Sequence, residues 1–267
     1  MLDEILSQAP VFLLIFARVF AMLLVLPMFS MRSASRVAKV ALAGYMAFFI
    51  FGTCDLSYYL PYIEQDGSFS MEYFLILIGE ALIGIILGFF ITMIFSAFST
   101  AGQFLAFQMG FSAASSYDSL SQVENPLMGQ FFNLIAMLVF MQTHWFQKLF
   151  LQGLVTSFSS LNAISIVNST ESIVKFVLSG LSSLFIDALV ISLPVMGSLF
   201  LISICTGLLT KAAPQMNLLS EGFPIMIMLA FAIIAFVLPD IIDFFVRSFE
   251  KGFEDLFDFF KNIFGGI

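Results

Sequence analysis

The feature that most constrains the fold of this 267-residue chain is a succession of long apolar runs that carry almost no charge. A helix needs roughly 20 mainly apolar residues to cross the hydrocarbon core of a bilayer. Six runs approach or exceed that length, and they occupy residues 9–27, 40–54, 73–98, 127–141, 176–209 and 223–238. The pattern predicts an all-α integral membrane protein with about six hydrophobic segments.

Composition indicates the surroundings that such a chain requires. Hydrophobic residues make up 60% and charged residues only 10% of the sequence, whereas soluble domains are roughly 45–50% apolar and about 25% charged. Lipid or other protein chains must therefore cover much of the surface. The formal net charge of -8 argues against a nucleic-acid partner, because binding phosphates requires clustered lysine and arginine.

In the second half of the chain, prolines predict breaks in two apolar runs, and spaced phenylalanines predict the character of the C-terminal helix. Pro194 and Gly197 interrupt the run at 176–209, which predicts a kink or hairpin with two helical pieces. The last run ends at Pro239. Beyond it, phenylalanines recur among charges at a spacing close to i, i+4, at Phe245, Phe249, Phe253, Phe257, Phe260 and Phe264. This spacing predicts a C-terminal amphipathic helix that lies on the membrane interface or on a partner subunit.

Two polar stretches separate apolar runs. Residues 55–72 contain four acids, Pro61 and Gly67, and we expect a solvated loop there. Residues 99–125 mix small, polar and apolar side chains, a composition too polar for lipid and too apolar for a free loop. It favours a re-entrant or pore-lining segment inside protein, with an ordinary loop packed on helices as the alternative.

Three ionisable residues, Arg18, Glu80 and Asp187, lie inside apolar runs. A charge at bilayer depth costs roughly 2.5–3.5 kcal/mol or more unless it is paired or hydrated. We favour an inter-helix or inter-subunit ion pair, in which Arg18 meets Glu80 or Asp187. The alternative is a proton or ion relay, but a relay usually lines one path with several carboxylates, and each run here offers at most one.

Few residues could support catalysis. His144 is the one histidine, which leaves little scope for a histidine-ligated metal and a single base for a triad. The sequence contains no G-x-x-x-x-G-K-[ST], H-E-x-x-H or G-x-S-x-G motif. We therefore predict no enzyme, no bound metal and no cofactor.

Strings spread along nearly the whole chain match a single family pattern. They comprise Ala17-Arg18-Val19, Pro27-Met28-Phe29, Arg32, Arg36-Val37-Ala38-Lys39, Glu80, Gly84, Gly102-Gln103, Gln108-Met109-Gly110-Phe111, Lys211-Ala212-Ala213-Pro214-Gln215-Met216-Asn217 and Gly222-Phe223-Pro224. With these residues the chain resembles the FliR/SctT family of type III secretion export-gate subunits. The string at 211–217 is the most specific. The pattern is broken near Ser35, which lacks a neighbouring proline, and at Ser119, Lys211 and Met226.

The resemblance implies a role and a set of partners. A member of this family assembles with FliP-like and FliQ-like subunits, and works beside FlhB-like and FlhA-like components, in the bacterial inner membrane at the flagellar basal body. Unfolded flagellar subunits pass through the gate. Residues 1–150 would be a FliP-like part and residues 151–267 a FliQ-like part, both built as helical hairpins.

The resemblance also implies particular site residues. Gln108, Met109, Gly110, Phe111, Ser112 and Ala113 match a plug that closes the gate, where apolar side chains exclude water and ions. Lys211, Pro214, Gln215 and Asn217 belong to a turn that joins two hairpin helices. A stand-alone secondary transporter or ion channel, a purely structural membrane scaffold, and a virulence-type gate of the same family remain the alternatives.

Overall fold

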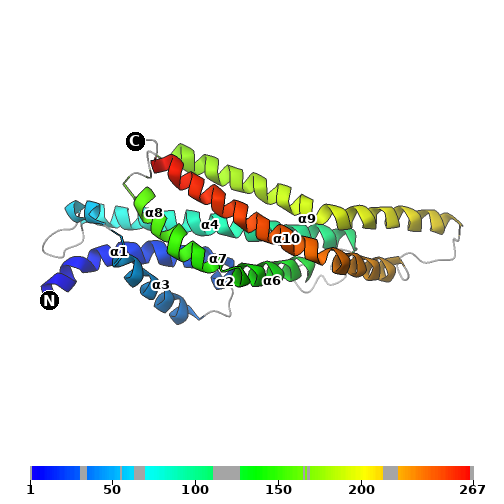
Figure 1. Ribbon diagram of the computed structural model, residues 1–267, viewed down its shortest axis with the longest axis horizontal. Coiled ribbons are helices and arrows are strands. Elements are labelled where there is room, and N and C mark those ends of the chain that lie inside the picture. The colour runs from blue at the N-terminus through cyan, green and yellow to red at the C-terminus, as the bar shows by residue number, and fades with distance from the viewer. Residues whose placement is uncertain are drawn as a thin grey trace. The chain divides into compact units, whose positions relative to one another are not determined.

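The computed structural model describes residues 2–30, 35–54, 56–62, 70–110, 127–164, 166, 169–212 and 222–264. Within these ranges every regular element is a helix and none is a strand (Figure 1). The predicted all-α class is confirmed. Three helices are long and apolar enough to cross a membrane, namely α4 (Met71–Gln108), α9 (Thr170–Ala212) and α10 (Phe223–Phe264). A fourth candidate span is α6 (Leu127–Gln142) taken together with the helical stretch Trp145–Ser160.

The first two predicted segments form a packed pair of helices. Helix α1 (Leu2–Val25) is followed by the short α2 (Pro27–Ser30) and then by α3 (Arg36–Phe51), which lies against α1. The hydroxyl of Ser35 accepts a hydrogen bond from the Ala38 N–H at 3.1 Å. This contact satisfies one of the N–H groups that every helix start leaves without an internal partner.

The stretch predicted as a solvated loop is partly buried. A 3₁₀ helix, η1 (Ser57–Tyr62), lies within it, and α4 already begins at Met71. Leu56 and Tyr59 are buried. The loop prediction is therefore wrong for residues 56–62, because the apolar and aromatic side chains there outweigh the acids that flank them.

The predicted division of residues 176–209 into two helical pieces is wrong, and so is the predicted end of the last run at Pro239. The alternative of a kink at Pro194 stays a prediction. Helix α9 continues through Pro194, and α10 continues through Pro239 into the phenylalanine-rich tail. A proline removes one backbone hydrogen bond but leaves the rest of a long helix intact. In the same way α4 runs past Phe98 to Gln108, so the first part of the polar segment 99–125 is helical.

The contacts divide the chain into two compact units that interleave along the sequence. The first unit consists of residues 1–93, 144–180 and 251–267, and the second of residues 94–143 and 181–250. The expected division at residue 150 is of a different kind, because it separates a part that resembles one gate subunit from a part that resembles another. It stays a prediction.

In the first unit, α1 and α4 pack closely side by side. A Cβ added to Gly84 would clash with the carbonyl of Arg18, and a Cβ at Gly88 would lie 2.8 Å from the Met22 carbonyl oxygen. Only glycine permits this approach of two helix backbones. Gly84 and Gly88 therefore act as close-packing positions between the two helices.

In the second unit, the phenylalanine stripe of α10 packs against α4 and α6. The ring of Phe245 lies 4.0 Å from that of Phe98, and Phe249 lies 5.1 Å from Phe95 and 5.2 Å from Phe140. The amphipathic character is confirmed, but the predicted cover by membrane or partner is wrong for these residues. Their own chain covers them, which the spacing alone could not reveal.

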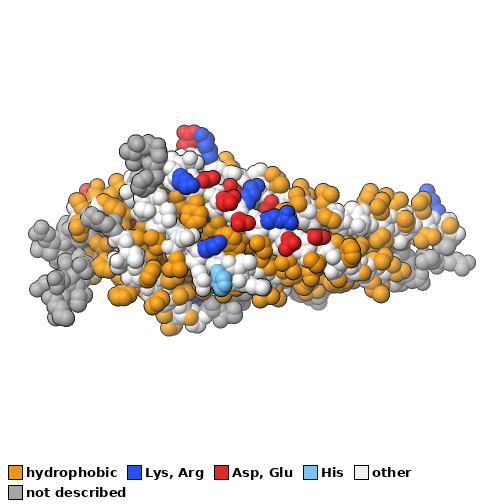
Figure 2. Space-filling model, in the orientation of Figure 1, with side chains coloured by type: hydrophobic (Ala, Val, Ile, Leu, Met, Phe, Trp, Pro, Cys, Tyr) orange, Lys and Arg blue, Asp and Glu red, His pale blue; other side chains and the backbone are white. Residues whose placement is uncertain are grey.

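The opposite face of α10 is charged. Figure 2 shows acidic and basic side chains gathered along this helix, while apolar side chains dominate elsewhere on the same face of the molecule. Asp243, Arg247, Glu250, Glu254 and Asp258 are all exposed. Such a face suits water or polar protein rather than lipid tails.

Candidate functional site

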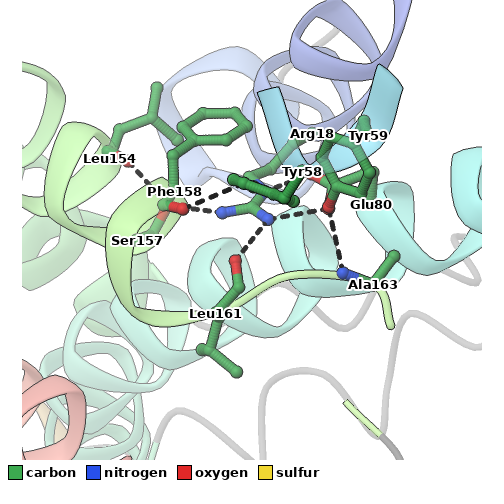
Figure 3. Close-up of polar contacts among 9 residues, drawn as sticks. All are labelled: Arg18, Tyr58, Tyr59, Glu80, Leu154, Ser157, Phe158, Leu161 and Ala163. Atoms are coloured by element: carbon green, nitrogen blue, oxygen red, sulfur yellow. Dashed lines mark hydrogen bonds and ion pairs between the residues drawn. The ribbon is translucent and has the colours of Figure 1, made fainter. Parts of the chain in front are cut away.

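The most constrained polar site is a buried ion pair in the first unit. Arg18 of α1 and Glu80 of α4 are both 0% exposed (Figure 3). Arg18 Nε donates to Glu80 Oε2 at 2.6 Å, and Nη2 donates to Oε1 at 2.9 Å. Two parallel bonds of this kind are the strongest geometry available to an arginine and a carboxylate. Of the two partners considered for Arg18, the structure thus places Glu80 beside it.

The other N–H groups of Arg18 are bound by a distant part of the chain. Nη1 donates to Ser157 Oγ at 3.0 Å, and Nη2 donates to the Leu161 carbonyl at 2.8 Å. Ser157 lies in α8 (Val155–Ser160), which follows the short α7 (Trp145–Lys148) and the π-helical turn η2 (Leu149–Leu154). The guanidinium carbon also lies 3.9 Å from the centre of the Phe158 ring, a cation–π contact.

Glu80 is equally well supplied with donors. The Tyr59 hydroxyl and the Ala163 N–H, the latter at 3.1 Å, both donate to Oε1. Gly79 leaves room for Ala163 to approach α4, because a Cβ at position 79 would lie only 2.7 Å from the Ala163 Cβ. Burial, and then the nearby Glu80 carboxylate, raise the pKa of Tyr59, so its hydroxyl keeps its proton and remains a donor.

This arrangement is a brace between separate segments of the chain. It joins α1, η1, α4 and the segment after α8, and its two charges have no exposed surface. A buried pair in which every guanidinium nitrogen has an acceptor is the form in which charges are tolerated in a low-dielectric interior. Among the described residues no group of three or more His, Cys, Asp or Glu side chains could hold a metal ion.

Asp187 lies in the second unit and has a different environment. Its Oδ2 accepts a hydrogen bond from the Ser248 hydroxyl of α10 at 2.5 Å. In the part of the chain that the structure describes, Asp187 makes no ion pair. The carboxylate is half-buried and has one neutral donor.

The predicted plug residues lie at and beyond the end of α4. Gln108 is the last residue of α4, Met109 is fully buried, and Gly110 has a left-handed φ of 81°. Glycine adopts that backbone conformation without steric cost, so it suits the end of the helix. Phe111, Ser112 and Ala113 lie outside the described residues.

The helix that leads to these residues is firmly held. A Cβ at Gly102 would lie 2.5 Å from the Met128 carbonyl oxygen, and a Cβ at Gly129 would lie 3.0 Å from the Ser99 carbonyl oxygen. The end of α4 and the start of α6 therefore pack backbone against backbone.

The predicted family turn is described only at its start. Lys211 lies exposed in the last turn of α9, which ends at Ala212, and α10 begins at Phe223. Pro214, Gln215 and Asn217 lie outside the described residues.

Sequence reasoning missed most of the residues that complete the ion-pair site. Ser157 and the backbone groups of Leu161 and Ala163 carry no sequence signal that distinguishes them from ordinary helix and loop residues. Tyr59 is the exception, because a tyrosine pair beside a proline in an acidic stretch could have indicated a buried aromatic element.

The described residues form helices, and three of these helices are candidate membrane spans, so the structure is that of an all-α integral membrane protein. Comparison with known proteins identifies the family within this class. Residues 9–252 match the family described as bacterial export proteins, family 1. The chain belongs to this family.

Similar proteins agree with that assignment. The flagellar biosynthetic protein FliR of Bacillus subtilis (strain 168) is 32% identical over 86% of this chain and 86% of its own. FliR of Escherichia coli (strain K12) is 28% identical over 92% of this chain and 91% of its own. The surface presentation of antigens protein SpaR of Shigella sonnei is 30% identical over 73% of each chain. The predicted family, and with it the predicted role as a membrane subunit of a type III protein-export gate, are confirmed.

Proposed function

We propose that this chain is a subunit of the flagellar export gate and resides in the inner membrane at the flagellar basal body. The observation that carries the proposal is similarity to FliR proteins over most of the chain. The similarity to SpaR, over a smaller share of the chain, supports a virulence-type gate as the second candidate. Deleting the gene should abolish flagella in the first case and leave them intact in the second.

In this proposal the chain acts by conformation and carries out no chemistry of its own. Its partners are FliP-like and FliQ-like subunits, with FlhB-like and FlhA-like components nearby, and unfolded protein is the cargo. Large exposed apolar side chains on α3, α4, α6, α9 and α10 support a multi-subunit assembly, because extensive apolar surface requires either lipid or protein cover. Residues 1–150 would take the FliP-like position and residues 151–267 the FliQ-like position.

Residues 108–113 would form the plug of the closed gate. The fully buried Met109 supports this role, because methionine is flexible and makes a deformable apolar seal. The close α4–α6 contact at Gly102 and Gly129 supports it as well, since it gives the plug a rigid anchor. The turn that contains Lys211, Pro214, Gln215 and Asn217 would join the helices of the second hairpin, and the Arg18–Glu80 brace would hold the first.

The test is to delete residues 109–113 in an otherwise complete gate. We expect the membrane to leak small ions, measured as loss of membrane potential with a voltage-sensitive dye. Lys175→Ala, which changes an exposed residue of α9 remote in sequence from the deletion, is the control and should leave the potential unchanged. A tight membrane around a fully assembled deletion variant would refute the plug.

A further inference from the structure

We propose that one face of α9 is the docking surface for an apolar helix of a neighbouring subunit, and that this helix brings a lysine or arginine to Asp187. The inference deepens the proposed function, because it rests on this chain working within a multi-subunit gate. It assigns to Asp187 a partner outside the chain and states the chemistry of that partner.

The α9 outer face consists of large apolar side chains that follow a helical spacing. Their exposed fractions run from 46% to 64%, and the residues are Ile186, Val190, Leu193, Phe200, Ile204 and Leu208. They recur at intervals of three, four or seven residues, so they share one side of the helix. Nothing in the described chain covers them.

Asp187 lies at the edge of this face. It interrupts a run without any other charge, from residue 176 to residue 210. One hydroxyl, from Ser248, is its only partner among the described residues. A carboxylate in an apolar helix is stabilised best by an opposite charge, because a neutral donor returns little of the lost hydration energy. Glu80, in comparison, has a guanidinium and two further donors within its own chain.

A helix fits this face better than lipid does. Lipid tails offer no hydrogen-bond donor to Asp187. Gly197, in the middle of the face, has no atom within 4 Å of the position of a Cβ, whereas Gly102 of the same unit packs tightly against a helix backbone. A glycine exposed to lipid only weakens a helix, but one that faces another helix lets the two backbones approach.

Two exposed cations of α10 lie within three residues of Ser248, Lys251 after it and Arg247 directly before it, and Arg247 is the nearer in sequence. It makes no ion pair with Asp187 in the described structure. An intrachain pair with Arg247 is therefore the competing explanation, and the experiment must separate the two.

The experiment uses the full chain, tagged, in cells that lack the chromosomal copy but make every other export subunit. The tagged chain is purified in mild detergent, and co-purified subunits are quantified by mass spectrometry. Asp187→Lys should reduce the neighbouring subunit at least about tenfold, because it places two positive charges together. Asp187→Glu should retain it, and reversing the partner's basic residue to glutamate should restore assembly with Asp187→Lys.

Photo-crosslinking identifies the occupant of the face. A benzoylphenylalanine replacing Leu193 should crosslink to an apolar helix of another export subunit, near a lysine or arginine of that helix. Gly197→Leu tests the same surface without changing charge. It should block assembly if a neighbouring helix covers the face, and leave assembly unchanged if lipid covers it.

Several outcomes would overturn the inference. These are full assembly with Asp187→Lys, crosslinks to lipid alone, or a loss with Arg247→Ala that matches the loss with Asp187→Asn. Swimming motility separates this failure from failure of the proposed function. If the unmodified chain restores swimming and Asp187→Lys also assembles, the inference alone is wrong; if the unmodified chain does not restore swimming, the flagellar role is wrong.

Discussion

At the scale of single residues, the Arg18–Glu80 pair shows how a chain this apolar tolerates full charges in its interior. Moving an ion out of water costs several kcal/mol, and only matched hydrogen bonds and an opposite charge offset that cost. Arg18 makes four hydrogen bonds, two of them to Glu80. The pair therefore contributes little to net stability while intact, but either partner alone would be strongly destabilising.

This asymmetry gives the first prediction. Arg18→Met or Glu80→Gln alone should lower the free energy of unfolding by about 3–5 kcal/mol, whereas Arg18→Met combined with Glu80→Met should cost clearly less than the sum. The measurement is thermal unfolding of the purified gate complex. Lys175→Ala, which breaks an exposed pair with Glu171 on α9, is the control and should have little effect. Additive losses in the double variant would contradict the prediction.

The sequence was sufficient to single out both members of this pair, because ionisable residues stand out in apolar runs. It was not sufficient to find Ser157, Leu161 and Ala163, since a serine and two backbone groups acquire their role only when the chain brings them to the charges. Asp187 was recognisable in the same way, but its Ser248 partner was not.

At the scale of helices, hydrophobic runs predicted where helices exist better than where they end. Pro194 and Pro239 fail to end α9 and α10, because packing along the rest of a long helix outweighs one lost hydrogen bond. The phenylalanine stripe predicted an apolar face for the end of α10, but the identity of the covering surface depends on α4 and α6.

The aromatic contact leads to the second prediction. Phe249 is fully buried among Phe95, Phe98 and Phe140, so Phe249→Ala should lower stability by about 3–5 kcal/mol through lost contacts and a cavity. Limited proteolysis of the chain in native membranes measures the change as faster cleavage. Asp243→Ala, on the exposed face of the same helix, should cleave at the unmodified rate. Equal cleavage of both variants would show that the stripe is not packed as described.

At the scale of the whole molecule, the long helices differ in how far the chain covers them. The share of buried residues falls from 44% in the apolar window of α4 to 28% in α9 and 22% in α10. Helices α9 and α10 therefore depend more than α4 on lipid or on neighbouring subunits. This difference, together with family membership, supports assembly with partners at the second hairpin.

The third prediction concerns location. The chain should sediment with inner-membrane vesicles on a density gradient and resist extraction by alkaline carbonate, because three helices are apolar and long enough to span a bilayer. An outer-membrane porin and a peripheral membrane protein serve as the two controls. Release into the soluble fraction by carbonate would contradict an embedded location.

The brace around Arg18 also constrains how the chain is made. A ribosome completes Glu80 well before it reaches Ser157, Leu161 and Ala163, which supply the missing hydrogen bonds. The early helices thus leave the ribosome with the Arg18–Glu80 pair lacking these hydrogen bonds. The missing bonds can form only after translation has passed residue 163. The Arg18 site therefore gains its full set of hydrogen bonds only when a later segment closes over the early helices.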